Sequence, residues 1–126
     1  WELRAIGAGA VPPLLRRADG TTGWLETAGF PIGTSTAASY REVVAQVAPG
    51  DTLLLMSDGV IEAMSAGREL FGFDGVVAAM GDSPVEQGAH AVLASVIAAV
   101  RGHAGAAEQN DDITLIVVRV LAGSAG

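Results

Sequence analysis

The chain has 126 residues, half of them apolar, which is enough for a single domain with a hydrophobic core. It has no cysteine, which excludes disulfides and thiolate metal sites, and its formal net charge of -7 comes from 14 acidic residues against 7 basic residues, all of them arginine. An acidic chain without a basic cluster is a poor candidate for binding nucleic acid or an anionic membrane, whereas its carboxylates suit cations.

The first half of the chain predicts short strands separated by turns. Four strands are expected, over residues 1–10, 12–17, 24–29 and 40–47. The pair Asp19-Gly20 between the second and third of these is a strong hairpin signal. Pro31 interrupts the pattern that follows, so residues 30–39 are expected to form an irregular connection.

The second half predicts a buried strand, then helices, then another buried strand. The two strands are expected over 52–57 and 113–120, because their apolar residues are continuous rather than alternating. Short helices are expected over 60–64 and from about 74 to 80, and a loop over 101–110. This order of elements indicates an α+β fold rather than a doubly wound parallel sheet.

The clearest helix signal lies within residues 82–100. Ser83 can cap this helix, Pro84 suits its first position, and Glu86 stands three residues after the cap. Its apolar stripe consists of Val85, Ala89, Val92, Leu93, Val96, Ile97 and Val100. We expect this stripe to pack on a sheet.

The sequence shows no targeting segment and no membrane span. It opens without a methionine or a basic region, and its longest apolar runs are too short to cross a bilayer. Trp1 as the first residue suggests a piece cut from a longer protein, and processing is the alternative explanation. We therefore expect a cytoplasmic protein or domain.

Carboxylates stand where the two buried strands would meet. Asp58 follows the first strand, and Asp111 and Asp112 precede the second. If these strands are antiparallel neighbours, the end of the first lies beside the start of the second, and the carboxylates converge at one edge of one sheet. Clustered carboxylates repel one another unless a cation neutralises them, and oxygen ligands suit Mg²⁺ or Mn²⁺.

Two nearby residues could support such a site. Gly59 permits a positive φ and a close backbone approach, and the hydroxyl of Thr114 could support the acidic turn. However, Asp-Gly is an ordinary turn pair, and Asn-Asp-Asp is an ordinary polar start of a strand. On the residues alone, plain turns are the commoner explanation, and both interpretations stay open.

Three stretches together resemble a known family. They are PPLLRRADGTTGWLETAGFPIG (12–33), VAPGDTLLLMSDGVIEAM (47–64) and NDDITLIVVRV (110–120). In this order they resemble the C-terminal part of the SpoIIE-type, metal-dependent (PPM) protein serine/threonine phosphatases. The resemblance implies that 1–121 is the C-terminal portion of such a domain and 122–126 a tail. It also implies the family's fold, which here would be part of an α-β-β-α sandwich with mainly antiparallel sheets.

The resemblance also implies a chemistry. Asp58 and Asp111 would be catalytic as metal ligands, with Gly59, Asp112 and Thr114 supporting them. Two Mn²⁺ or Mg²⁺ ions in the intact domain would activate a water that attacks phosphorus. The implied substrate is phosphoserine or phosphothreonine on a small regulatory protein, such as an anti-anti-sigma factor.

The chain departs from the family pattern in two places. Residues 1–52 contain no match to the Asp-Gly and Gly-His-Gly motif that supplies the bridging aspartate, and residues 7–10 read Gly-Ala-Gly-Ala where the family carries Asn-Ala-Gly-His. We therefore expect an enzyme in the intact parent and an inactive fragment here. The alternative is a degenerate, non-catalytic phosphatase fold that binds a partner. An incomplete sandwich should also expose apolar faces, so a homo-oligomer is expected for the chain alone.

Overall fold

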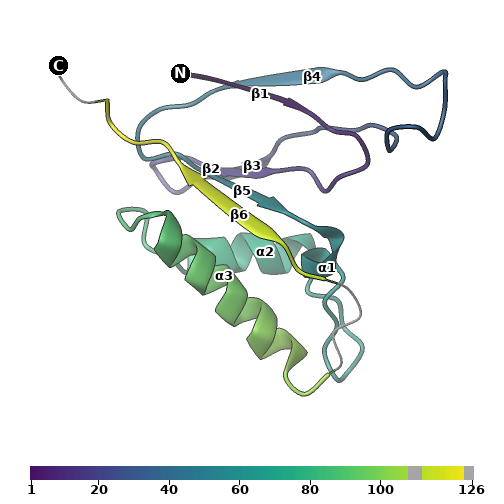
Figure 1. Ribbon diagram of the computed structural model, residues 1–126. Helices are drawn as coiled ribbons and strands as arrows, with labels where there is room; N and C mark the ends of the chain where they lie inside the picture. The colour runs from purple at the N-terminus through teal and green to yellow at the C-terminus, as the bar shows by residue number, and fades with distance from the viewer. Residues whose placement is uncertain (108–111, 124–126) are drawn as a thin grey trace.

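The computed structural model describes residues 1–107 and 112–123. In this part of the chain, strands form two sheets and helices cover one of them (Figure 1). The elements are β1 (Glu2–Ile6), β2 (Leu14–Arg16), β3 (Thr22–Trp24), β4 (Glu42–Gln46), β5 (Thr52–Met56), α1 (Asp58–Ile61), α2 (Gly72–Gly81), α3 (Ala89–Ala104) and β6 (Leu115–Arg119).

The larger sheet has four strands in the order β3-β2-β5-β6, and every neighbouring pair is antiparallel. The β2–β3 pair is the hairpin that Asp19-Gly20 predicts. The β5–β6 pair joins the two continuous apolar runs, with Leu54 opposite Val117 and Met56 opposite Leu115. The expectation that these two strands are antiparallel neighbours is therefore confirmed.

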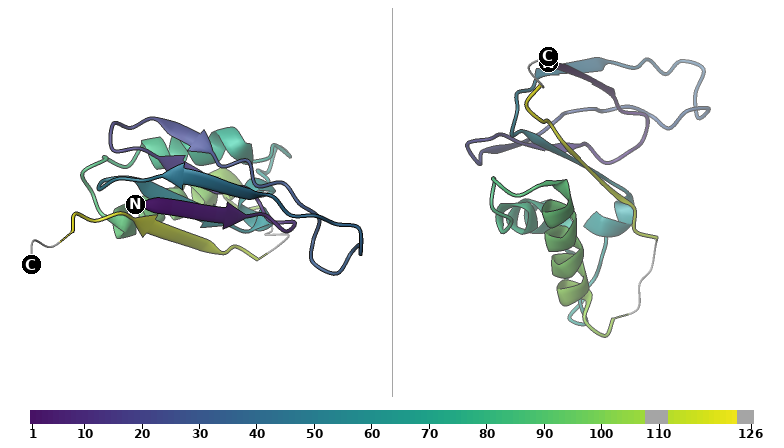
Figure 2. Two further views of the ribbon diagram at one scale, coloured as in Figure 1. Left: turned by 90° about the horizontal axis from the view of Figure 1, so that it is seen from above. Right: turned by 60° about the vertical axis from the view of Figure 1, so that its left-hand side comes forward.

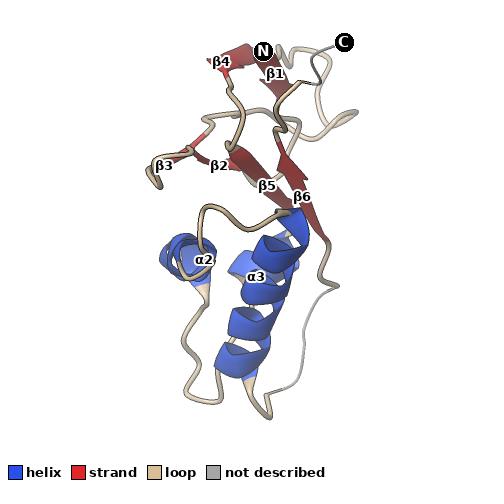
Figure 3. Cartoon of the chain, turned by 90° about the vertical axis from the view of Figure 1, so that its left-hand side faces the viewer, coloured by secondary structure: helices blue, strands red, loops and turns tan. Residues whose placement is uncertain are grey.

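The smaller sheet pairs β1 with β4, also antiparallel. It lies on the side of the larger sheet that faces away from α2 and α3 (Figure 3). The connection between β3 and β4 extends beyond the sheets, toward the end of the molecule where α1 lies (Figures 1 and 2). This layered arrangement, with antiparallel sheets throughout the described residues, confirms the expected α+β class.

The hydrophobic core lies between the larger sheet and the helices. The core residues with the least exposure are Leu14, Leu54, Val60, Val76, Met80, Val92 and Val96. Removing each of these side chains from water contributes about 1.5–3 kcal/mol. Trp24 on β3 meets Phe73 on α2 edge to face, with ring centroids 5.0 Å apart, and so extends the core to the sheet edge.

The opposite face of the larger sheet becomes more exposed toward β6. Leu15, Leu53 and Val118 form one row across β2, β5 and β6. Leu15 is 4% exposed, but Val118 is 47% exposed, and Ile116 on the same strand is 54% exposed. Because β6 ends the described sheet, an apolar surface lies beside an open strand edge.

Two arginines attach the connection between α2 and α3 to the sheet. Arg16 on β2 is 1% exposed and donates from Nη1 to the carbonyls of Met80 and Ser83, both at 2.7 Å. Arg119 on β6 donates to the carbonyls of Val85 and Gln87 at 2.7 and 2.6 Å. Burial and then the nearby charge of Arg119 lower the pKa of Arg16, whereas Glu86 raises it.

These contacts explain why α3 begins later than the sequence predicts. The predicted cap at Ser83 is wrong: the cap is Gly88, and the helix begins at Ala89. Carbonyls of residues 83, 85 and 87, which a helix would pair with its own N–H groups, bind the two arginines instead. At its other end α3 continues to Ala104, so the predicted loop over 101–110 is wrong for its first four residues.

Other boundaries also differ from the predictions. The strand predicted over 24–29 is β3 at Thr22–Trp24, because the hairpin pairs Trp24 directly with Leu14. α1 begins at Asp58 rather than at residue 60, and α2 begins at Gly72 rather than near 74. None of the helices in the described ranges is long and apolar enough to cross a membrane.

Candidate functional site

The candidate site lies at the sheet edge where β5 ends and β6 begins. Met56 and Leu115 are the last pair of this ladder. Asp58 begins α1 two residues after Met56, and Asp112 stands three residues before Leu115. Both aspartates are exposed. The fold therefore brings Asp58 and the start of β6 to one edge, whereas Asp111 falls outside the described residues.

Ser57 joins the two sides of this edge through three hydrogen bonds. Its backbone N–H donates to the carbonyl of Thr114 at 3.0 Å, and its hydroxyl oxygen accepts from the N–H of Thr114 at 2.9 Å. The same hydroxyl donates to the carbonyl of Asp112 at 3.2 Å. Sequence reasoning missed Ser57, since a serine just before Asp-Gly looks like an ordinary helix cap.

Two predicted supporting residues are in place but differ in detail. Gly59 is buried within α1, where the backbone is right-handed helical, so the positive φ expected for it does not occur. Thr114 is exposed, and the bonds that tie it to Ser57 come from its main chain rather than from its hydroxyl. Their roles at a metal stay predictions.

The oxygen atoms at this edge are of the chemical type that binds divalent cations. Carboxylates and carbonyls are the ligands that Mg²⁺ and Mn²⁺ prefer. Asp58 and Asp112, which stands just before the neighbouring strand, are exposed residues that each carry a carboxylate. Within residues 1–107 and 112–123, no three His, Asp or Glu side chains gather closely enough to hold a metal ion. These described residues alone therefore do not form a complete metal site.

A cleft of about 560 Å³ lies between α3 and the start of β6. It is lined by Ile97, Val100, Arg101, Asp112, Ile113, Thr114 and Leu115. The cleft shares Asp112 and Thr114 with the candidate edge, and Arg101 of α3 also lines it. Its lining is thus a mixture of apolar and polar residues.

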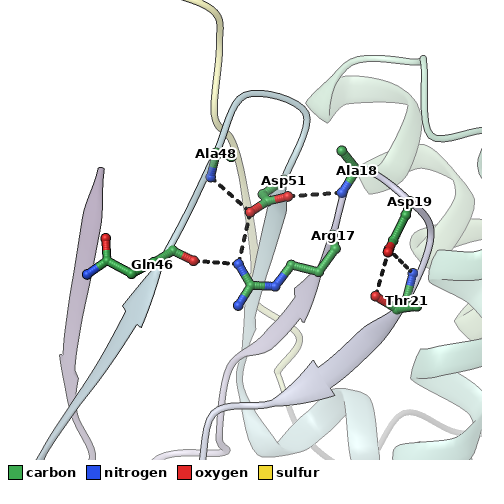
Figure 4. Close-up of polar contacts among 7 residues, drawn as sticks. All are labelled: Arg17, Ala18, Asp19, Thr21, Gln46, Ala48 and Asp51. Atoms are coloured by element: carbon green, nitrogen blue, oxygen red, sulfur yellow. Dashed lines mark hydrogen bonds and ion pairs between the residues drawn. The ribbon is translucent and has the colours of Figure 1, made fainter.

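At the opposite end of β5, Asp51 forms a polar network that joins the two sheets (Figure 4). Burial of the Asp51 carboxyl raises its pKa, but hydrogen bonds from the N–H groups of Ala48 and Ala18 and from Arg17 outweigh burial, and the pKa lies below its ordinary value. Arg17 also donates to the carbonyl of Gln46 on β4. This network holds the scaffold and lies away from the candidate edge.

The Gly-Ala-Gly-Ala segment after β1 is packed tightly against the segment after β3. A Cβ added at Gly7 would lie 2.3 Å from the carbonyl oxygen of Thr27, and one at Gly29 would lie 2.1 Å from the carbonyl oxygen of Gly7. Such distances exclude a side chain unless the backbone moves. Position 7 therefore does not accept the asparagine of the family pattern in this conformation.

Solved structures share this fold. The SiaA-PP2C domain of Pseudomonas aeruginosa matches with a TM-score of 0.80 and 23% identity, over 94% of this chain and 46% of that one. The RsbU and RsbW domains of Rv1364c from Mycobacterium tuberculosis match with a TM-score of 0.77 and 25% identity, over 98% and 34%. The PP2C phosphatase domain of SpoIIE from Bacillus subtilis, with a fragment of its regulatory domain, matches with a TM-score of 0.74 and 22% identity, over 98% and 35%.

The chain thus spans less than half the length of each of these structures. Comparison with curated protein sequences gave no match. Residues 1–121 match the family described as stage II sporulation protein E (SpoIIE). Because this match covers nearly the whole chain, the protein belongs to the stage II sporulation protein E (SpoIIE) family.

Proposed function

We propose that this chain is the C-terminal portion, residues 1–121, of a cytoplasmic protein serine/threonine phosphatase that uses Mn²⁺ or Mg²⁺. One observation carries the proposal. The antiparallel β5–β6 ladder places Asp58 at the end of one strand beside the start of the other, which Asp111 and Asp112 precede in the sequence. Membership of the SpoIIE family supports the phosphatase class.

In this proposal Asp58 and Asp111 hold the metal, and the chain around them keeps the edge in shape. Two ions bound there would supply a water acidified toward neutral pH for attack on phosphorus. The two carboxylates would bind the ions. Gly59 lies inside α1, which begins at Asp58, and the main chains of Asp112 and Thr114 fix the start of β6 through Ser57. One matched structure, the SpoIIE phosphatase domain from Bacillus subtilis, is described as presoaked with Mn, which supports that choice of ion.

The proposed substrate is a phosphoserine or phosphothreonine on a small regulatory protein, such as an anti-anti-sigma factor. The matched structure that contains both RsbU and RsbW domains supports a regulatory partner of this kind. The formal net charge of -7 makes the whole chain a poor candidate for binding nucleic acid.

A second candidate is a non-catalytic module that keeps the phosphatase fold and binds a partner without turnover. The packing of Gly7 against Thr27 and Gly29 favours it, because this contact excludes the polar side chain that the family pattern carries at position 7. The two candidates make different predictions for a longer protein that contains this chain.

The test is hydrolysis of a phosphoserine protein by that longer protein, with and without added Mn²⁺. The enzyme proposal predicts Mn²⁺-dependent release of phosphate, whereas residues 1–126 alone release none. Absence of turnover in the longer protein, although it is folded and binds a partner, would favour the non-catalytic module.

A further inference from the structure

We propose that Ser57 is a positioning residue for the candidate metal edge. It holds the main chain of Asp58 at a fixed place relative to the start of β6, and so restricts where the Asp58 carboxylate can meet a metal ion. This inference rests on the proposed function, because it concerns the same carboxylate.

The hydroxyl of Ser57 is used in an unusual way for its position. Ser57 is the N-cap residue of α1, with an extended backbone at φ -83° and ψ 164°. A serine at this position normally accepts a hydrogen bond from an N–H of the first helical turn. Here the side chain makes no such cap bond and instead joins Asp112 and Thr114 across the edge. The hydroxyl therefore stabilises the contact between two segments rather than the helix.

The three bonds continue the ladder beyond its last pair. Beyond the pair of Met56 and Leu115, the Ser57 N–H donates to the carbonyl of Thr114. The Ser57 hydroxyl then accepts from the N–H of Thr114 and donates to the carbonyl of Asp112. Asp58 is the next residue, so its main chain is fixed on one side by this connection and on the other by α1. Rotation about the side-chain bonds of Asp58 is then the main freedom left to its carboxylate.

This restraint matters because metal sites tolerate little displacement of a ligand. A functional site needs its groups within about 0.5 Å of the productive geometry. Replacing a residue that orients a ligand without touching the metal typically weakens metal binding or activity by about 10- to 100-fold. Ser57→Ala should therefore weaken Mn²⁺ binding by about that factor, although alanine removes no metal ligand.

The experiment measures Mn²⁺ affinity in the longer protein by the electron paramagnetic resonance signal of free Mn²⁺, together with the melting temperature. Ser65→Ala is the matched control, because Ser65 is also half-buried and its hydroxyl also accepts a backbone N–H, that of Glu69 at 3.1 Å. Ser57→Thr keeps the hydroxyl and should restore binding. Should Ser57→Ala not fold, Ser57→Cys, which keeps the shape but bonds weakly, takes its place.

The outcomes distinguish the positioning role of Ser57 from the metal-binding role of Asp58. The inference predicts weak Mn²⁺ binding in Ser57→Ala, near-normal binding in Ser57→Thr and Ser65→Ala, and similar losses of melting temperature in the two alanine variants. Unchanged affinity in Ser57→Ala, or equal weakening in Ser57→Thr, would overturn it while leaving the proposed function intact. Normal Mn²⁺ binding in Asp58→Asn would instead overturn the metal role of the edge itself.

Discussion

Arg17 and Asp51, beside strands β2 and β5 of the larger sheet, form an ion pair with 3.1 Å between Nη1 and Oδ2, and a further bond from Arg17 reaches the smaller sheet. Arg17 follows β2 and also donates to the carbonyl of Gln46 on β4, while Asp51 precedes β5. Asp51 is 3% exposed, and its carboxylate accepts hydrogen bonds from two backbone N–H groups in addition to the bond from Arg17. The ionised carboxylate of Asp51 thus holds together the segment after β2, the end of β4 and the turn before β5.

Asp51 should make the protein sensitive to acid. Because its pKa in the folded state is lowered, its stabilisation is present above the unfolded-state pKa of about 3.9 and is lost as the pH falls through the lower folded value. Asp51→Asn should cost about 1.5–3 kcal/mol near neutral pH and should flatten the acid side of the stability profile. Urea unfolding at a series of pH values measures both. The exposed Glu26→Gln serves as control, and an Asp51→Asn profile as steep as the wild type would contradict the assignment.

The two arginines that bind the α2–α3 connection should differ in importance. Each donates to two carbonyls, but Arg16 is fully buried, whereas Arg119 is half-buried. Arg16→Ala leaves a cavity and two carbonyls without their donor, which should cost about 2–5 kcal/mol. Arg119→Ala should cost less, since water can reach the freed carbonyls. Chemical denaturation measures the loss of stability in each variant. An equal loss, or a larger loss in Arg119→Ala, would show that burial does not set the importance of these arginines.

A pair of leucines tests the packing of the helices on the sheet. Leu54 on β5 is 0% exposed in the core, whereas Leu93 on α3 is half-buried and lines a groove of about 300 Å³ on the helix surface. Leu54→Ala should cost about 2–5 kcal/mol. Leu93→Ala makes the same chemical change at a partly solvated position and should cost clearly less. Equal losses in urea unfolding would mean that Leu93 is buried by something beyond the described contacts.

The exposed face of β6 predicts self-association of the chain when it is expressed alone. Ile116 and Val118 are about half exposed beside an open strand edge, a combination that seeks a partner. Sedimentation velocity across a dilution series should show dimers or larger species. Ile116→Lys should shift the distribution toward monomer, and Thr36→Lys in the exposed β3–β4 connection should not. A wild-type chain that stays monomeric at every concentration would refute this prediction.

Much of the fold could be predicted from local patterns. Asp19-Gly20 indicates a hairpin, and two continuous apolar runs indicate the buried strands that pair as β5 and β6. The start of α3 could not be predicted, because it is decided by Arg16 and Arg119. Arg16 lies 64 and 67 residues from the carbonyls that it binds, and no local pattern signals such a contact.

The candidate site was predictable only in outline. Asp58 and the start of β6 could be placed at one edge, since antiparallel pairing alone brings them there. Ser57 could not be identified, because its role depends on the hydroxyl turning away from α1 toward Thr114, a choice that only the three-dimensional structure reveals. The right-handed backbone of Gly59 likewise follows from α1 beginning at Asp58, two residues earlier than the pattern of apolar residues suggests.

The most direct test of the proposed phosphatase is the rate of phosphoserine hydrolysis by Asp58→Asn in the longer protein, at saturating Mn²⁺. Asparagine keeps the size of the side chain but removes the charge that holds a cation, so the rate should fall by at least about 100-fold while the circular dichroism spectrum stays unchanged. Asp82→Asn, at an exposed aspartate just after α2, should keep the wild-type rate. Wild-type turnover in Asp58→Asn would contradict the account, because the edge between β5 and β6 would then not be where the metal acts.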